Sequence, residues 1–259
     1  MLKIRKEKFD IISFSAGKKN YYHASIPNED WMKKRYVKHT DIDIPLGHSR
    51  YGGAVIDLPK NIAHPENMRF AAQLDLASFA PYDSNNLLPE KGQLYFFVNA
   101  DLDKGNVFYA DVASEDLERI IVENGNYFWL GTLIKKIKGK TESFKSRFRD
   151  LDEMEIEECD ECLEEDWRNC DCEKDEEFTK GGQIWDEFAG SKKSKLFGIF
   201  THCQWEQDEI EEITLSDKIV LLQIGENKFN DSGVFSVVIK KKDLKNRNFK
   251  SCKFYWSQT

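Results

Sequence analysis

Four cysteines lie close together in one acidic stretch, as Cys159-x-x-Cys162 and Cys170-x-Cys172. Four thiolates can complete a tetrahedral zinc site, and a CxxC pair supplies two of them from one turn. The neighbouring carboxylates attract a cation, but they raise the thiol pKa values before a metal arrives. Because four thiolates suffice for a closed zinc site, we expect a structural zinc here. The alternatives are a flexible acidic loop with incidental or redox-active thiols, and disulfides.

A second set of residues could bind a ligand. Gly52 and Gly53 follow Arg50, and paired glycines allow backbone conformations that could turn amide N–H groups toward an anion. Gln73 and Gln223 each interrupt an apolar stretch, where an amide must find hydrogen-bond partners. The set predicts a ligand cleft. The simpler interpretation is a tight turn at the glycines, with glutamines that bond to neighbouring backbone.

Residues for nucleophilic catalysis do not form a recognised pattern. The chain has five histidines and no GxSxG motif, and the adjacency of His202 and Cys203 does not establish a usable pair. Asp75 and Asp101 could be read as an acid–base pair, but aspartates beside strand ends usually cap turns. The sequence therefore names no catalytic residue and favours a binding protein over an enzyme.

Two similar strand–turn–strand units position the two glutamines. They span residues 68–99 and 219–239, and each contains short apolar runs bounded by Gly, Pro or Asn. Gln73 in the first unit matches Gln223 in the second, and Gly92 matches Gly233. This repeat predicts an internal duplication.

The other segments mix strands with short helices. A helix is expected within residues 25–38, which begin acidic and end basic, and another after the N-cap and acidic turn at 114–116. An acidic loop is expected between residues 196–204 and the second unit. Further strands are expected at residues 8–15, 106–112, 127–134 and 254–256. This order lacks regular βαβ alternation and predicts an α+β fold with a mostly antiparallel sheet.

The composition is typical of a globular protein. Apolar residues make up 40% of the chain, which argues against disorder, and no apolar stretch approaches the roughly 20 residues of a membrane span. The N-terminal segment is charged and does not resemble a secretory signal, and the six cysteines do not resemble a secreted disulfide scaffold. We therefore expect a cytoplasmic protein.

The net charge of −8 is distributed unevenly along the chain. Residues 150–177 contain 16 acidic and two basic residues, whereas the rest of the chain is basic on balance. Because no nucleic-acid motif accompanies the lysines, we read them as a solvated surface. The expected organisation is one domain with a first half at 43–149, an acidic, cysteine-rich insertion at 150–180 and a second half at 181–259.

Five segments together resemble the pattern of a known protein family. They are GGAVIDLP, RFAAQLDL and LPEKGQLYFFV in the first half, and IVLLQIGENKFNDSGVFSVVI and DLKNRNF in the second. Their order and spacing resemble the YwqG-like family of bacterial proteins, a domain of unknown function. The resemblance covers most of the chain from about residue 44 to 259, apart from the insertion. It implies a cytoplasmic α+β protein with an internal duplication and no agreed activity. Some relatives look to be encoded beside toxin systems, so it also implies an immunity or partner-binding role.

One segment departs from the family pattern. In its second half the family usually has a histidine, a basic and an apolar residue, two glycines, an aromatic residue and a proline, ahead of a glutamine. Here residues 194–201 read SKLFGIFT, without the leading histidine, the second glycine or the proline, although Gln204 remains. A role that depends on that histidine is not expected, and His202 does not simply replace it.

These observations favour a non-enzymatic binding protein, with a protein partner preferred over a small ligand. The alternative is an enzyme or small-ligand-binding protein that uses a cleft between the duplicated halves. The ligand-cleft candidates are Arg50, Gly52, Gly53, Gln73 and Gln223. Neither a membrane nor nucleic acid is expected as a partner.

Overall fold

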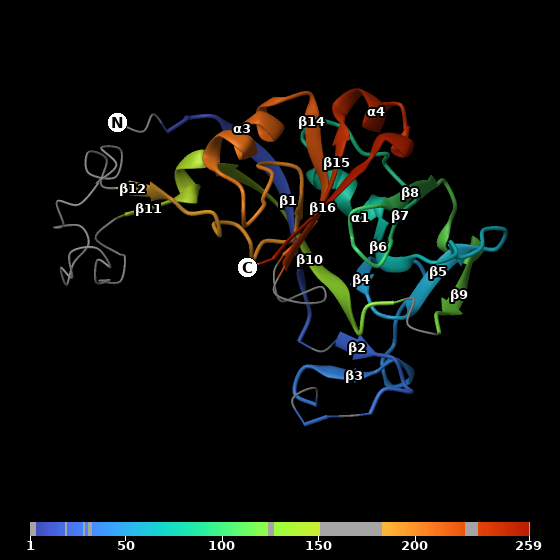
Figure 1. Ribbon diagram of the computed structural model, residues 1–259. Helices are drawn as coiled ribbons and strands as arrows, with labels where there is room; N and C mark the ends of the chain where they lie inside the picture. The colour runs from blue at the N-terminus through green and yellow to red at the C-terminus, as the bar shows by residue number, and fades with distance from the viewer. Residues whose placement is uncertain are drawn as a thin grey trace.

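A computed structural model describes residues 4–18, 20–27, 29–30, 33–123, 127–150, 183–225 and 233–258. Its main feature is a long sheet (Figure 1) in which ten strands follow one path. In spatial order they are β16 (Lys253–Gln258), β15 (Gly233–Lys240), β14 (Lys218–Ile224), β13 (Lys195–Leu196), β1 (Lys8–Ala16), β10 (Leu130–Ser143), β4 (Arg50–Gly52), β6 (Arg69–Asp75), β7 (Gln93–Val98) and β8 (Gly105–Ala110). Every neighbouring pair on this path is antiparallel.

Six further strands make up the rest of the β structure in the described residues. β2 pairs with β10 and, in parallel, with β3, and two separate pairs join β5 to β9 and β11 to β12. Their bounds are β2 (Asn20–Tyr22), β3 (Tyr36–Lys38), β5 (Val55–Pro59), β9 (Leu117–Ile121), β11 (Phe148–Asp150) and β12 (Gln183–Trp185). The prediction of a mostly antiparallel sheet is confirmed.

Both predicted hairpins are present and share one irregularity. In the β6–β7 pair the register shifts between Phe70 and Ala72. In the β14–β15 pair it shifts between Val220 and Leu222. In each hairpin the shift ends one residue before the glutamine, so both strands carry a bulge at the same place relative to that residue.

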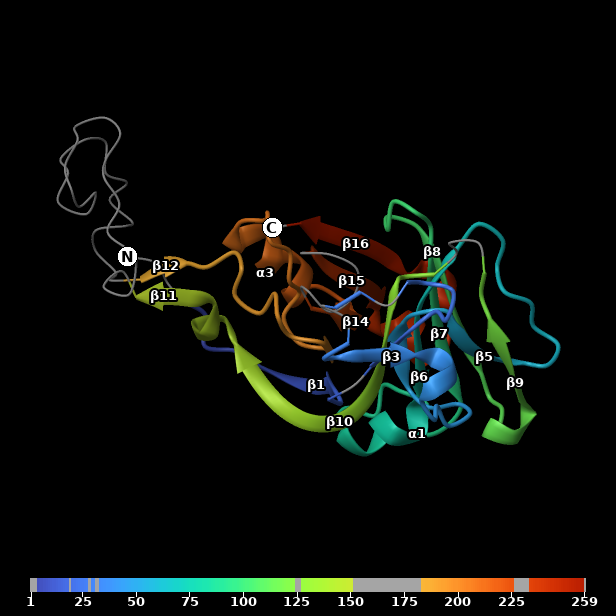
Figure 2. The same ribbon diagram turned by 90° about the horizontal axis from the view of Figure 1, so that it is seen from below.

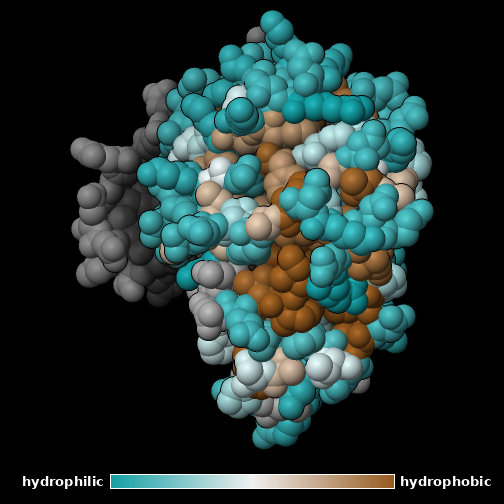
Figure 3. Space-filling model, turned by 90° about the vertical axis from the view of Figure 1, so that its right-hand side faces the viewer, coloured by the Kyte–Doolittle hydropathy of each residue, from teal (hydrophilic) through white to brown (hydrophobic). Residues whose placement is uncertain are grey.

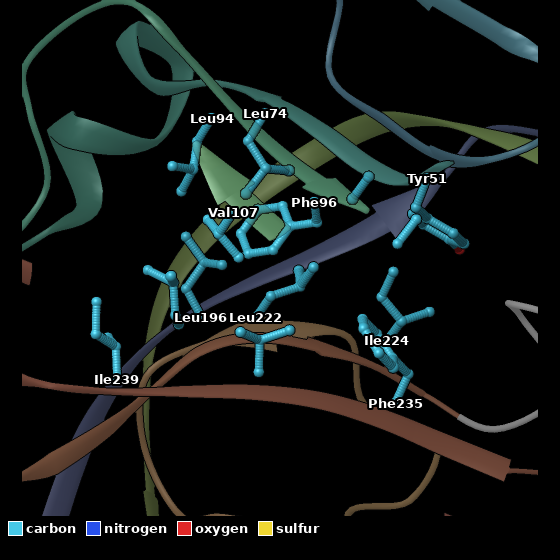
Figure 4. Close-up of a cluster of buried hydrophobic side chains, with 14 of the residues drawn as sticks. Tyr51, Leu74, Leu94, Phe96, Val107, Leu196, Leu222, Ile224, Phe235 and Ile239 are labelled. Atoms are coloured by element: carbon cyan, nitrogen blue, oxygen red, sulfur yellow. The ribbon is translucent and has the colours of Figure 1, made fainter. Parts of the chain in front are cut away.

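The two hairpins face each other across the main hydrophobic core. Leu74 and Phe96 approach it from the first half, and Leu222 and Phe235 from the second (Figure 4). Successive strand residues point to opposite faces, so these apolar positions line the concave side of the curved sheet. The space between the halves is therefore filled by packed side chains.

The two end strands of the sheet, β8 and β16, approach each other and nearly close it into a barrel. Figure 2 shows β1 and β10 curving beneath the space that separates the two sets of strands. A Cβ atom at Gly105 of β8 would lie only 2.5 Å from the ring of Phe254 in β16. The Arg247 guanidinium, after β15, also lies 4.9 Å from the centre of the Tyr109 ring of β8. Side chains rather than strand hydrogen bonds thus join the ends.

The β5–β9 pair forms a second layer over the outer face of β6 and β7. Ile56 and Leu58 of β5 pack with Phe70, Tyr95 and Phe97 in a separate buried cluster. Figure 1 shows this pair at the edge of the molecule beside β6 and β8. The outer face of the first hairpin is therefore buried as well, which explains why its strands are apolar on both sides.

The helices are few and short. The α-helices are α1 (Leu76–Phe79), α3 (Gln207–Leu215) and α4 (Lys241–Lys245), and the 3-10 helices are His39–Asp41, Ala80–Tyr82, Ser114–Asp116, Phe144–Arg147 and Phe249–Ser251. The expected acidic loop before the second hairpin is wrong, because residues Gln207–Leu215 form α3. Glu206 and Glu209 form a capping box at its start, while Ile210 and Ile213 are buried on one face.

Both predicted helices are wrong in the described residues. After Ser114–Asp116 the chain forms β9, in which Ile120 and Ile121 contact different apolar clusters, as successive strand residues do. Within residues 25–38 the chain turns and then forms β3. A hydrogen bond of 3.0 Å from the Ala24 N–H to His39 Nδ1 spans this segment and holds the turn. Across the described ranges, no helix is long and apolar enough to cross a membrane.

Candidate functional site

Arg50 and Gln73 meet in a buried polar cluster, which we call the Arg50 cluster (Arg50, Asp57, Gln73, Gln93 and Arg119). Arg50 on β4 lies directly opposite Gln73 on β6, and its Nη2 donates to Gln73 Oε1 over 3.0 Å. Gln73 Oε1 also accepts the Asp57 N–H at 3.1 Å. Gln73 Nε2 donates to Gln93 Oε1 over 2.9 Å. The Gln73 amide therefore uses both its donor and its acceptor side inside the protein.

Two arginines neutralise the fully buried carboxylate of Asp57. Arg50 Nη2 lies 2.6 Å from Asp57 Oδ2, and Arg119 Nε lies 2.8 Å from Oδ1. Burial alone would raise the pKa of Asp57, but the hydrogen bond from Arg119 and the charge of Arg50 outweigh it and hold that pKa below its usual value. Because Arg119 is 34% exposed, the cluster reaches water only through that side chain.

The remaining donors of Arg50 bind backbone. Its Nε donates to Val55 O over 2.9 Å and its Nη1 to His48 O over 3.1 Å. The Tyr95 hydroxyl adds a bond of 2.8 Å to Asp57 O. These bonds tie β5 to β4 and β7, so the cluster attaches the outer β5–β9 layer to the main sheet.

Gly52 and Gly53 allow a close approach of backbone to β10. Both have positive φ angles, 63° and 73°, which glycine adopts without strain. A Cβ at Gly53 would lie 2.7 Å from the Gly131 Cα, and one at Gly52 would overlap the Leu130 carbonyl oxygen. The Gly53 N–H donates to Phe128 O over 3.0 Å, so this amide is already bonded inside the protein.

A second buried ionic group, which we call the Lys195 cluster (Glu142, Arg147 and Lys195), connects the end of β10 and the following 3-10 helix to β13. Lys195 Nζ donates to Glu142 Oε1 and, over 2.7 Å, to Ile199 O. Burial lowers the pKa of Lys195 to about 7, and the nearby Glu142 charge only partly opposes this. Arg147 Nη2 donates to Thr201 Oγ1 over 2.8 Å. All three charged residues are buried.

Gln223 lies beside the Lys195 cluster and away from Gln73. Lys195 on β13 lies opposite Gln223 on β14, and Gln223 Nε2 donates to Lys193 O over 2.7 Å. Its neighbours Leu222 and Ile224 point into the main core, so Gln223 points to the outer face, as Gln73 does in its own half. The structure thus brings Arg50, the two glycines and Gln73 into one half and Gln223 into the other.

A pocket of about 390 Å³ lies elsewhere, where the two halves meet. We call it the lysine pocket. Among the described residues, its apolar lining comes from Phe9, Leu87, Phe197 and Ile219, and its polar lining from Lys8, Asp10, Asn85, Gly198, Thr214, Lys218, Lys241 and Lys245. None of the five ligand-cleft candidates belongs to this lining.

The sequence analysis did not single out several of these residues. Asp57 interrupts an apolar stretch in the same way as Gln73, and this signal could have marked it. Lys195 appeared only as part of a segment that departs from the family pattern. Glu142 and Arg147 lie in a lysine-rich segment that read as solvated surface, so no local signal distinguished them.

The four clustered cysteines lie outside the described residues, so the zinc prediction stays a prediction. Within residues 4–150, 183–225 and 233–258, apart from their short gaps, no three His, Cys, Asp or Glu side chains come together as a metal site. Cys203 is 1% exposed, and the neighbouring His202 ring stacks on Trp205 with centres 4.6 Å apart.

The geometry defines a protein with a curved, nearly closed antiparallel sheet and two internal ionic clusters. A domain of unknown function, DUF1963, matches residues 49–257, and the chain belongs to this family. No curated protein matches the chain closely enough to count as a relative. Because the function of this domain is unknown, membership of the family assigns no activity.

Proposed function

We propose that this protein is a non-enzymatic binding protein whose partner is another protein. One observation carries the proposal: an apolar surface beside β8 and β9, which we call the β8–β9 face. Figure 3 views the side of the molecule that carries these strands and shows an apolar area surrounded by polar residues. We define the face by the half-buried apolar side chains that pack on the outer cluster, namely Met68, Phe108, Val112, Ile120 and Tyr127.

The composition and rigidity of this face suit protein binding. Aromatic residues and methionine are enriched at the centres of protein interfaces, and contiguous apolar areas on a monomer often mark such sites. Phe108 stacks on Tyr95 with ring centres 4.6 Å apart and lies parallel to Phe97 at 5.9 Å. Because these rings are already fixed, a partner would lose little side-chain entropy on binding.

The buried ionic clusters support a structural role rather than catalysis. The donors of Arg50 end on Asp57, Gln73 and two backbone carbonyls, and Lys195 bonds to Glu142 and Ile199. Catalytic groups need access to a substrate, whereas these groups hold the layers of the protein together. Turnover of a defined metabolite by the pure protein, abolished by one point substitution, would contradict this part of the proposal.

We also propose that the two hairpins descend from one duplicated unit. The matched bulges and the cation opposite each glutamine support this view. The pairs Gly52–Gly53 and Phe197–Gly198 support it further, because each follows the cation by two residues and has positive φ angles. A YwqG-like relationship and a toxin as the partner are narrower forms of the proposal that rest on the sequence resemblance alone.

A pull-down from the native host, with this protein as bait, tests the binding proposal. The bait should be compared with a Val112→Lys, Ile120→Lys variant and with a matched Tyr82→Lys, Phe188→Lys control. The control residues are exposed apolar side chains, 43% and 40% accessible, that are not part of the face. We expect one protein to be captured by the wild type and the control but not by the face variant. Equal capture by all three would contradict the proposal that the β8–β9 face binds the partner.

A further inference from the structure

We propose that the lysine pocket binds a small organic molecule that carries phosphate groups. This goes beyond the proposed protein partner, because the pocket does not share residues with the β8–β9 face. Its volume of about 390 Å³ falls in the range of small-molecule sites, roughly 300–1,000 Å³. It also lies between the halves, with Leu87 from the first half and Phe197 from the second.

The floor of the pocket is apolar and already ordered. Leu87 and Phe197 belong to the main core, and Ile219 packs against it. Phe197 has a φ angle of 66°, a left-handed conformation that is costly for a residue with a Cβ and persists only where its surroundings fix it. This part of the lining is therefore preformed, and it offers apolar contacts to the non-ionic part of a ligand.

The rim of the pocket concentrates positive charge on a chain that is acidic overall. Lys241 and Lys245 are four residues apart on α4, so both side chains project from the same side of the helix. Lys8 and Lys218 add two further ammonium groups. Within the described part of the chain, none of the four has a carboxylate within ion-pair distance.

The only carboxylate in the described lining is Asp10, whose Oδ2 accepts a hydrogen bond of 2.7 Å from the Ser84 hydroxyl. Four lysines against one carboxylate give the described lining a positive balance, which attracts an anion. The described cations are all lysines, which bind phosphate as point charges.

Calorimetric titration of the intact protein with four probes tests this assignment. ATP carries both an apolar ring and phosphates, pyrophosphate carries only the charge, adenosine only the ring, and citrate carries carboxylates instead. We expect ATP to bind most tightly and more weakly as salt is raised, because its charge is the larger part of the recognition. Citrate binding more tightly than both phosphate probes would overturn the assigned ligand class.

Charge-reversal variants then locate the binding. Lys241→Glu, Lys245→Glu should weaken ATP binding by about tenfold or more, since hydrogen bonds to charged groups contribute that much each. Lys250→Glu, Lys253→Glu changes two exposed lysines outside the pocket and should leave the affinity unchanged. Lys8→Glu, which changes a lining residue on β1, provides a second test if the α4 variant is poorly folded. Equal ATP affinity in the wild type and the pocket variants, or no ATP binding, would overturn the site without affecting the β8–β9 face.

Discussion

Lys195 lies directly opposite Gln223 in the β13–β14 pair, the position that Arg50 holds opposite Gln73 in the β4–β6 pair. In both halves a buried cation therefore stands beside a buried amide on the outer face of the sheet. A cation in such a place needs a counter-charge, because an isolated buried charge is very costly. Asp57 on β5 supplies it for Arg50, and Glu142 on β10 supplies it for Lys195.

Asp57→Asn should destabilise the protein by about 3–5 kcal/mol, because it leaves the buried Arg50 without its counter-charge. Urea unfolding followed by circular dichroism measures the loss. Asp217→Asn is the matched control, since Asp217 pairs with Lys240 at 3.4 Å where both side chains are more than half exposed. Its cost should stay below about 1 kcal/mol. Equal effects of the two substitutions would contradict a structural role for the Arg50 cluster.

The Lys195 cluster predicts a dependence of stability on pH. Burial lowers the pKa of Lys195 from 10.5 in the unfolded chain to about 7 in the folded protein. Between these pH values the folded protein binds fewer protons than the unfolded chain, so the stability of the folded state rises with pH. Relative to a Lys195→Met variant, the wild type should gain about 2 kcal/mol between pH 7.5 and 9.5.

Lys193 provides the control for this measurement. It lies 3.5 Å from Glu142, but its side chain is 44% exposed. A Lys193→Met variant should therefore follow the wild type through the same pH series. If the Lys195→Met variant shows the same rise in unfolding free energy as the wild type, the shifted pKa is not that of Lys195.

The sequence predicted the hairpins because their apolar runs are bounded by turn residues, and both appear with a glutamine in their first strand. It failed where a short pattern fitted two structures. Leu117, Ile120 and Ile121 have helical spacing, but their side chains are divided between two layers that exist only in the folded protein. Secondary structure at this site is decided by tertiary packing, which local spacing does not contain.

Prediction of the site was limited for a similar reason. Gln73 and Gln223 were recognised as polar residues in apolar strands, and their buried bonds agree with that environment. Their likeness did not reveal that both point away from the core that separates them. The lysine pocket draws on five separate stretches of chain, and no one stretch carries a pattern that marks it.

The close approach of β8 and β16 predicts that Gly105 is required at the closure of the sheet. Gly105→Val would place new atoms against Phe254 and the Phe97 carbonyl, and should cost about 1–3 kcal/mol or more. Gly139→Ala is the control, because the nearest heavy atom to its new Cβ is 3.8 Å away. Thermal unfolding of the two variants compares them. Equal transition temperatures would mean that the two end strands do not pack as described.

The cysteine cluster predicts one zinc per chain. Elemental analysis of protein purified without a chelator should find about one metal per chain, and a Cys159→Ser, Cys162→Ser variant should lose it. Cys203→Ser tests a cysteine outside the cluster and should keep the metal. Metal-free wild-type protein would contradict the prediction, and disulfide mapping would then identify any linked pairs.

The affinity of the purified partner for the β8–β9 face tests the account most directly. Titration calorimetry should compare the wild type, the Val112→Lys, Ile120→Lys variant and the Tyr82→Lys, Phe188→Lys control, after unfolding curves show that all three are folded. We predict that the face variant binds at least about thirtyfold more weakly, since truncating or charging a central contact costs about 2 kcal/mol or more, while the control is unchanged. An affinity of the face variant equal to that of the wild type would contradict the proposed function.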